Sequence, residues 1–80
     1  MLDPKQIEQW IAAGLACEHL AVKGDGQHFE AVIVSPEFRG KTRVQQHQVV
    51  YRALGNRMQA EIHALSMQTL TPEEWASRKG

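Results

Sequence analysis

Apolar residues near the start of the chain recur at helical spacing. The pair Asp3-Pro4 suits an N-cap followed by a first helical position, because the aspartate side chain accepts a backbone hydrogen bond and proline needs no N–H there. The apolar residues that follow share one helical face: Ile7, Trp10, Ile11 and Leu15. The pattern predicts a helix over residues 4–15 that packs through a single stripe.

Two short apolar segments come next, separated by glycines. Residues 19–23 alternate in polarity, and residues 29–34 form an apolar run with β-branched side chains. The Gly-Asp-Gly sequence at 24–26 tolerates positive φ. The pattern predicts two antiparallel strands joined by a short hairpin, and Pro36 ends the second strand because it has no N–H for the ladder.

A longer amphipathic pattern occupies the middle of the chain. A connection with Phe38 as an apolar plug and Gly40 as a turn leads into it. Its core-facing positions, assigned by helical spacing, are Val44, His47, Val50, Tyr51, Leu54 and Met58. The spacing predicts a helix over about residues 42–58, with Gly55 as a stop or a break.

The last part of the chain predicts one more strand and one more helix. Residues 61–68 alternate in polarity, and the sequence TPEE at 71–74 repeats the N-cap and proline signature and begins a short helix through Trp75. The element order is α-β-β-α-β-α. We therefore expect an α+β fold in which helices cover one face of a three-stranded mixed sheet.

The length of the chain limits what this fold can do alone. Its 80 residues, 42% of them hydrophobic, suit a single domain over residues 1–80 and exclude a two-domain enzyme. Most apolar side chains must enter the one core, which favours a binding role over self-sufficient catalysis. One cysteine allows no internal disulfide, and the sequence shows no leader and no membrane-length apolar run. We expect a soluble cytoplasmic protein.

Charge is balanced over the whole chain but not along it. The formal net charge is zero, yet residues 38–60 carry five basic side chains and no acidic one: Arg39, Lys41, Arg43, Arg52 and Arg57. A basic surface there would attract either an acidic protein surface or a phosphate backbone. The alternative is a solvated helix face, because the five charges are spread along the segment.

Histidines are the side chains here best suited to bind a metal. The chain has four: His19, His28, His47 and His63. We expect His47 to be a hydrogen-bonded residue at the core boundary and His19 to be solvated. His28 follows the hairpin turn and His63 lies early in the third strand, so both can project from one end of the sheet. Two imidazoles make an incomplete site, because zinc and iron–sulfur clusters take four ligands.

No sequence motif supports catalysis. Cys17 has no histidine and carboxylate placed beside it by any motif, and a lone cysteine usually behaves as a small buried or half-buried apolar residue. The sequence contains no nucleophile elbow, phosphate-binding glycine loop, paired-cysteine zinc motif or metalloprotease helix. We expect the chain not to be an enzyme.

Several segments together resemble one known family. They are QHFEAVIVS at 27–35, FRG at 38–40, QHQVVY at 46–51 with Leu54, IHALS at 62–66 and TLTPEEW at 69–75. In order and separation they resemble the BolA family, and within it the compact members of the YrbA/IbaG type. The resemblance covers nearly the whole chain and implies a fold similar to the class II KH domain.

The resemblance also implies a partner and a cofactor. BolA-like proteins pair with monothiol glutaredoxins that carry a CGFS motif, and the two proteins share a bridging [2Fe-2S] cluster. The glutaredoxin and glutathione supply sulfur ligands, and the BolA-like chain supplies a histidine from the third-strand region and a His or Cys near the first hairpin. By position, these ligands would be His63 and His28. Alone, the chain would hold no cluster and would be a monomer or a weak homodimer.

Three departures from the family pattern bear on function. The hairpin at 24–27 is short and has no cysteine. The sequence QHQ at 46–48 stands where many members have Arg-His-Arg, which removes two positive charges. The chain also lacks the GxxG loop with which KH domains hold a nucleotide backbone, so KH-like topology carries no inference about RNA.

Three hypotheses for function follow. The preferred one is a non-enzymatic partner of a monothiol glutaredoxin that helps to bind, transfer or sense a [2Fe-2S] cluster in iron–sulfur or iron homeostasis. The alternative is a DNA-binding transcriptional regulator of the stress response, which would use the basic long helix as a helix-turn-helix protein does. The third is a fold with protein contacts only and no metal.

Overall fold

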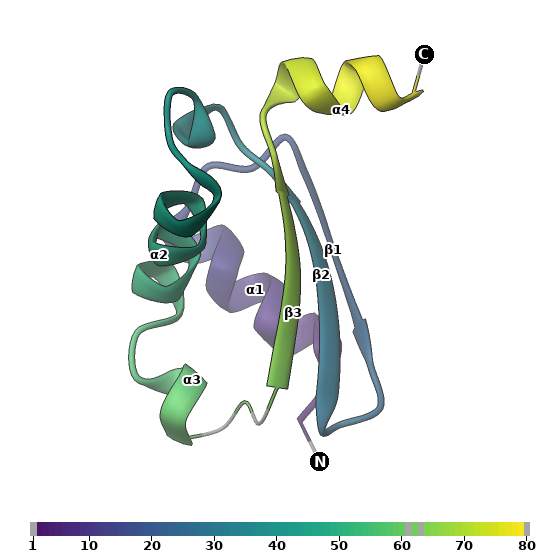
Figure 1. Ribbon diagram of the computed structural model, residues 1–80. Coiled ribbons are helices and arrows are strands. Elements are labelled where there is room, and N and C mark those ends of the chain that lie inside the picture. Colours follow the sequence, from purple (N-terminus) through teal and green to yellow (C-terminus); the bar gives the residue numbers. More distant parts are fainter. Residues whose placement is uncertain (1, 61, 63, 80) are drawn as a thin grey trace.

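The computed structural model describes residues 2–60, 62 and 64–79, which form one sheet with helices around it (Figure 1). The elements are α1 (Pro4–Gly14), β1 (His19–Gly24), β2 (His28–Val34), the 3-10 helix η1 (Pro36–Phe38), α2 (Arg43–Leu54), α3 (Arg57–Ala60), β3 (Ala64–Leu70) and α4 (Pro72–Lys79). The strand order is β1-β2-β3, with β1 antiparallel and β3 parallel to β2. The predicted α+β class and mixed three-stranded sheet are confirmed.

Helix α1 forms as predicted and packs through its apolar stripe. The carboxylate of Asp3 accepts a hydrogen bond from the Lys5 backbone N at 2.9 Å, which caps the helix start. The core buries residues from α1 and its C-cap, β2, η1, α2 and the segment before β3: Ile7, Ile11, Leu15, Phe29, Ala31, Ile33, Phe38, Val50, Leu54 and Ile62. Helices α1 and α2 lie together on this face of the sheet (Figure 1).

Helix α2 buries a face that overlaps the predicted one at Val50 and Leu54 but differs elsewhere. Its buried residues are Gln46, Val50 and Leu54. Val44 and Tyr51, which the spacing assigned to the core, are 66% and 41% exposed. That part of the prediction is wrong. The predicted break is confirmed, because α2 ends before Gly55, which has φ +63°, and α3 begins two residues later.

Gln46 can be buried because both the nitrogen and the oxygen of its side-chain amide make hydrogen bonds within the fold. Its Nε2 donates to the carbonyl oxygens of Phe38 and Lys41, each at 3.2 Å. Its Oε1 accepts a hydrogen bond of 2.7 Å from the hydroxyl of Thr69, which is itself completely buried. A buried polar side chain is tolerated when its hydrogen bonds are made, and this one ties α2 to η1 and to the end of β3.

Helix α4 lies across one end of the sheet (Figure 1). At that end, His19, Val34 and Leu70 are neighbours in the strand register, and alternation turns their side chains away from the α1–α2 layer. Val34 and Leu70 are nevertheless buried. Trp75 of α4 stacks on the His19 ring, so α4 covers the end of the second sheet face. No helix in the described part of the chain is long and apolar enough to span a lipid bilayer.

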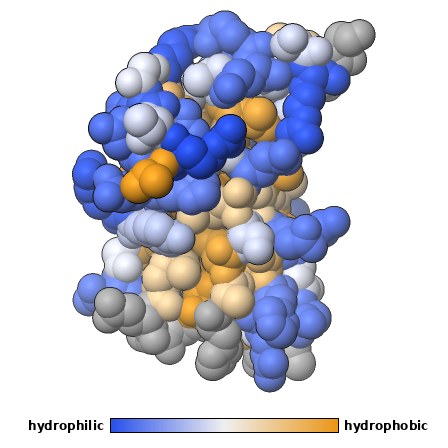
Figure 2. Space-filling model, in the orientation of Figure 1, coloured by the Kyte–Doolittle hydropathy of each residue, from blue (hydrophilic) through white to orange (hydrophobic). Residues whose placement is uncertain are grey.

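Strand β3 is an edge strand, and apolar surface lies beside it. Figure 2 shows apolar side chains gathered along the lower half of β3 and toward α2 and α3, while hydrophilic side chains surround them. Partly buried apolar residues of these elements pack on the core from this side, and they include Val49, Met58, Leu65 and Met67. The strand runs over residues 64–70, two residues past its predicted end.

Candidate metal centre

The parallel strands β2 and β3 start at the same end of the sheet. β2 begins at His28 and β3 at Ala64, and these two residues are register partners. His63, the first predicted ligand, lies outside the described residues and directly precedes Ala64 in the sequence. The hairpin and the start of β3 therefore meet at one end of the sheet, opposite the end that α4 covers.

His28 is held by the hairpin and exposed to solvent. Its backbone N donates to Asp25 Oδ1 at 2.9 Å, and the backbone N of Gln27 donates to the same oxygen at 3.0 Å. These two hydrogen bonds, first that of His28, hold the pKa of Asp25 below its ordinary value. The side chain of His28 is 78% exposed, and its Nδ1 lies 4.0 Å from Asp25 Oδ2. The ring is thus open to an external ligand.

Two glycines allow this tight hairpin. Gly26 has φ +101°, a conformation that side chains disfavour. A Cβ on Gly24 would lie 2.5 Å from the His28 carbonyl oxygen and 2.5 Å from Phe29 Cδ1. Asp25 N donates to the His28 carbonyl oxygen at 3.2 Å and closes the turn. The sequence Gly-Asp-Gly therefore sets where the β2 histidine emerges.

The other two histidines, His19 and His47, are half-buried, whereas His28 is exposed. His19 is half-buried under Trp75, with ring centroids 4.4 Å apart and planes 17° apart, so the prediction of a solvated His19 is wrong. His47 lies half-buried at the core boundary as predicted. Its Nε2 is buried and finds no hydrogen-bond partner in the described part of the chain, so the predicted hydrogen bond is not made at that atom.

Cys17 is half-buried and its thiol is weakly acidic. The Sγ donates to the Leu15 carbonyl oxygen at 3.4 Å. Burial, and then the negative charge of Glu37, raises the pKa of the Cys17 thiol. Since the thiolate is the reactive form and the metal-binding form, the environment of Cys17 disfavours both roles.

The side chains that could bind a metal are dispersed over the molecule. Across residues 2–60, 62 and 64–79, no three His, Cys, Asp or Glu side chains gather where they could hold a metal ion. Asp25 and His28 form a pair of such side chains, with Oδ2 and Nδ1 4.0 Å apart. A metal bound at this end of the sheet would therefore need ligands beyond those that the described residues provide.

The basic residues predicted as a nucleic-acid or partner surface divide between the two ends of α2. Arg39, Lys41 and Arg43 lie at the start of this helix, and Arg52 and Arg57 lie at or after its last turn. Arg43 and Arg52, the nearest members of the two groups along the helix, are nine residues apart in α2, about 13.5 Å at about 1.5 Å per residue. The five charges do not form one compact patch.

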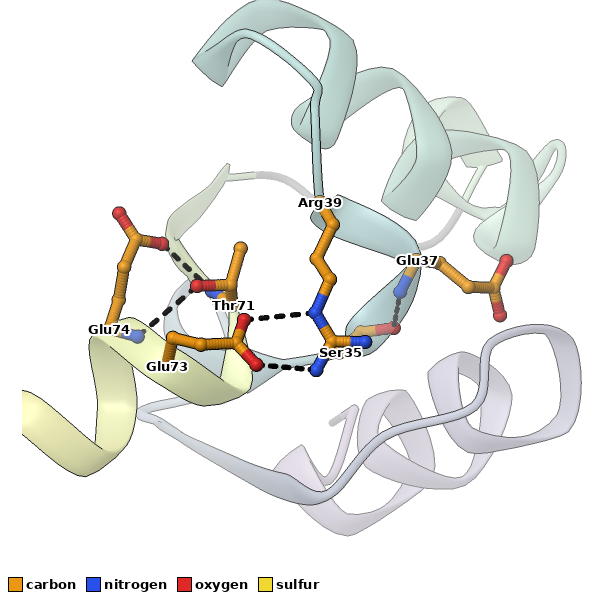
Figure 3. A network of polar contacts seen from close by, with 6 residues as sticks. All are labelled: Ser35, Glu37, Arg39, Thr71, Glu73 and Glu74. Atoms are coloured by element: carbon orange, nitrogen blue, oxygen red, sulfur yellow. Dashed lines mark hydrogen bonds and ion pairs between the residues drawn. The ribbon is translucent and has the colours of Figure 1, made fainter.

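Arg39 is neutralised by an acidic residue of α4. Its Nε donates to Glu73 Oε1 at 2.9 Å and its Nη2 donates to Glu73 Oε2 at 2.6 Å (Figure 3). The paired guanidinium holds the pKa of Glu73 below its ordinary value.

The cap of α4 forms as predicted. The Thr71 backbone N donates to Glu74 Oε1 and the Glu74 backbone N donates to the Thr71 hydroxyl (Figure 3).

Three other basic side chains donate to backbone carbonyl oxygens. Lys41 donates to Glu37 at 2.8 Å, Arg43 to Thr69 at 2.8 Å and Arg57 to Leu54 at 3.3 Å. The Arg57 guanidinium also lies 4.7 Å from the centre of the Trp10 ring, in a cation–π contact. Arg52 is exposed. Four of the five predicted residues thus have contacts within the fold that a nucleic acid would have to replace or share.

Sequence reasoning missed Asp25 and Glu73 as partners of the candidate residues. Asp25 was interpreted only as a turn residue. The sequence did carry a signal for its backbone contacts, because Asp side chains often accept a hydrogen bond from the main chain two residues later. Asp25 stands two residues before Gln27 and three before His28, whose backbone N–H groups donate to its carboxylate. Glu73 gave no local signal, since its partner Arg39 is 34 residues away.

Comparison with known families defines the class of protein. The chain belongs to the BolA family: the BolA-like protein family matches residues 5–74, from the first turn of α1 into α4. This match confirms the resemblance seen in the sequence. The matched segment contains the hairpin, the start of β3 and the basic residues around α2.

Particular relatives carry names of two kinds. The chain is 40% identical over 60 residues to the DNA-binding transcriptional regulator BolA of Haemophilus influenzae, covering 75% of this chain but 58% of that protein. It is 34% identical over 76 residues to the acid stress protein IbaG of Escherichia coli, covering 94% of this chain and 90% of IbaG. A solved BolA homologue from Coxiella burnetii has a TM-score of 0.87 and 47% identity, with 95% of this chain and 99% of that chain covered.

Proposed function

We propose that this chain is a non-enzymatic partner of a monothiol glutaredoxin that helps to bind, transfer or sense a [2Fe-2S] cluster. His28 and His63 would be its ligands, and the glutaredoxin and glutathione would supply sulfur. The observation that carries the proposal is the exposed His28 ring at the end of the sheet where β3 starts. The residue before that start is His63.

The donor atoms at this end suit such a cluster. In Rieske centres two histidines replace two cysteines on one iron, so imidazole nitrogen is an established ligand for [2Fe-2S]. When bound, the cluster would supply iron and sulfide for transfer or an electron for sensing. Neutral nitrogen in place of anionic sulfur raises the reduction potential and makes ligation sensitive to protons. A shared, releasable cluster fits those properties.

The surface beside the candidate centre suits a protein partner. Apolar side chains gather along the half of β3 nearest its start (Figure 2). Partly buried Leu65 and Met67 belong to this strand. Apolar surface next to an incomplete metal site is what a partner that encloses a cluster would cover.

DNA binding is the second candidate, because the Haemophilus relative is named a DNA-binding transcriptional regulator. The basic residues give it less support than His28 gives to cluster binding. Arg39 is paired with Glu73, and Arg43 and Arg57 donate to backbone carbonyl oxygens. Phosphate contacts would compete with these internal partners.

The cluster proposal is tested by mixing the chain with a cluster-loaded CGFS glutaredoxin and glutathione. We expect the visible absorption and circular dichroism spectra to change, and expect His28→Ala and His63→Ala to reduce that change. His19→Ala is the control, because His19 lies at the other end of the same sheet, about 20 Å along β2 at about 3.3 Å per residue. If His63→Ala gives the same spectral change on mixing as the unmodified chain, the ligand assignment is contradicted. A complex that forms equally well without cluster, and with no spectral change, would favour the metal-free hypothesis.

The DNA proposal is tested by duplex retention at low salt. We expect binding to weaken steeply with salt, and to fall for Arg52→Glu and Arg43→Glu, if the basic residues contact phosphates. Glu30→Gln is a control on a distant sheet face. No retention of DNA at low salt by the unmodified chain would exclude this function.

A further inference from the structure

One carboxylate in the hairpin contacts both the main chain and the ring of the candidate ligand. Asp25 uses Oδ1 for the backbone N–H groups of Gln27 and His28. Its second oxygen, Oδ2, is left on the side of the imidazole, 4.0 Å from Nδ1. The contact pairs a specific carboxylate oxygen with a specific ring nitrogen.

We infer that Asp25 is a positioning residue for His28: its Oδ2 favours the tautomer with the proton on Nδ1, so that the Nε2 lone pair is the one presented to a metal. Metal-binding histidines commonly donate their other ring N–H to a carboxylate, which sets the tautomer and the ring orientation. The identity of the metal rests on the proposed function. The effect on the ring is a property of this chain alone.

The backbone around Asp25 fixes where its carboxylate lies. Asp25 N donates to the His28 carbonyl oxygen, so the carboxylate and the imidazole belong to one closed turn. Gly26 permits the turn with φ +101°, and a side chain at Gly24 would collide with His28 and Phe29. Both Oδ1 hydrogen bonds restrict rotation of the Asp25 side chain. The hairpin therefore fixes the position of the Asp25 carboxylate from which Oδ2 approaches the His28 ring.

The distance and exposure set the expected strength. At 4.0 Å the contact is longer than a direct hydrogen bond, and the two side chains are 72% and 78% exposed. The carboxylate therefore biases the ring without locking it. We expect an effect at the lower end of the range for such outer carboxylates, about 10-fold in cluster retention.

Asp25→Asn separates the two roles of the carboxylate. The asparagine Oδ1 still accepts the two backbone hydrogen bonds, so the hairpin is kept, while the negative charge beside Nδ1 is removed. Glu30→Gln also removes one negative charge, from the β2 face to which His28 belongs by alternation, and serves as the matched control. Asp25→Ala removes both roles and reports the cost of losing the turn.

The test has two readouts. In the isolated chain, the nitrogen-15 shifts of the neutral His28 ring report its tautomer. We expect a larger Nδ1–H fraction in the unmodified chain and in Glu30→Gln than in Asp25→Asn. In the complex with glutaredoxin, we expect the cluster signal to decay about 10-fold faster for Asp25→Asn than for Glu30→Gln.

The possible results separate this inference from the proposed function. An unchanged tautomer in Asp25→Asn overturns the inference, whatever the cluster does. A changed tautomer with an unchanged cluster lifetime, while His28→Ala loses the cluster, also overturns it and leaves the proposed function intact. An unchanged cluster signal in His28→Ala overturns the ligand assignment itself, and with it the extension of the inference to iron.

Discussion

The indole ring of Trp75 stacks on the imidazole ring of His19, with centroids 4.4 Å apart and an angle of 17° between their planes. This contact joins α4 to the first residue of β1. Together with the Arg39–Glu73 pair it holds α4 against the end of the sheet that is farthest from His28. The two contacts therefore concern the stability of the fold and are separable from the candidate metal centre.

Loss of the stacked rings should destabilise the fold without affecting the cluster. We expect Trp75→Ala to lower the free energy of unfolding by about 1–3 kcal/mol and His19→Ala by about 0.5–1.5 kcal/mol, because aromatic pairs contribute on that scale beyond the area they bury. Urea unfolding followed by far-ultraviolet circular dichroism measures both. The double variant should show a coupling energy between the two positions, and strictly additive effects would contradict the stacking contribution.

The Arg39–Glu73 pair should stabilise the fold in a pH-dependent way. The pKa of Glu73 is held below its ordinary value of 4.5, so the stabilisation is fully present above that value and is lost as the pH falls through the lowered pKa. We expect Glu73→Gln to be slightly less stable than the unmodified chain at neutral pH and to match it in strong acid. Both side chains are largely solvent-exposed, so the difference should be small and should shrink with added salt. A difference independent of pH would contradict this origin.

The buried hydrogen bond between Thr69 and Gln46 should be costly to remove. Thr69→Val keeps the shape of the side chain but leaves Gln46 Oε1 without its 2.7 Å partner. We expect a loss of about 1–3 kcal/mol in the free energy of unfolding, the usual penalty for an unsatisfied buried acceptor. Thr69→Ser retains the hydroxyl and is the control. If the serine variant proves the less stable of the two, the methyl group rather than the hydrogen bond is what matters at this position.

Gly24→Ala should disturb the hairpin and the candidate centre together. The new Cβ would meet the His28 carbonyl oxygen and Phe29 Cδ1 at 2.5 Å, so the strand must shift. We expect a loss of about 1–3 kcal/mol in stability, as for other overpacked sites, and a weaker cluster signal with glutaredoxin. Gly40→Asn is the control, because asparagine tolerates the φ of +74° there and Gly40 has open space around it. Normal cluster binding by Gly24→Ala would show that the position of His28 is not critical.

The parts of the fold that follow from local pattern were predicted well. Helix α1 and the hairpin are determined by residues close in sequence, namely the Asp3 cap, the stripe of apolar residues and the Gly-Asp-Gly turn. Helical spacing predicted the burial of Val50 and Leu54 on α2, but not that of Gln46. Gln46 enters the interior only because Phe38, Lys41 and Thr69 supply its hydrogen bonds, and helical spacing scores it as polar.

The candidate site shows the same division between local and distant information. The histidines that can bind a metal are visible in the sequence, and so is the end of the sheet to which His28 belongs. The environment of each histidine is not visible in the sequence. His19 lies under Trp75, 56 residues later in the chain, and Arg39 is neutralised by a residue of the last helix. Such pairs become known only when the strands and helices are placed in space.

Only Thr71 separates β3 from α4, so the helix is attached to the strand with almost no slack. A fluorophore or affinity tag fused after α4 would consequently extend from the end of the sheet at which β3 finishes, and Leu70 there is about 20 Å from Ala64 along a strand of seven residues. Labels for measuring glutaredoxin capture or cluster exchange belong on that side, where their bulk leaves the approach to the hairpin open.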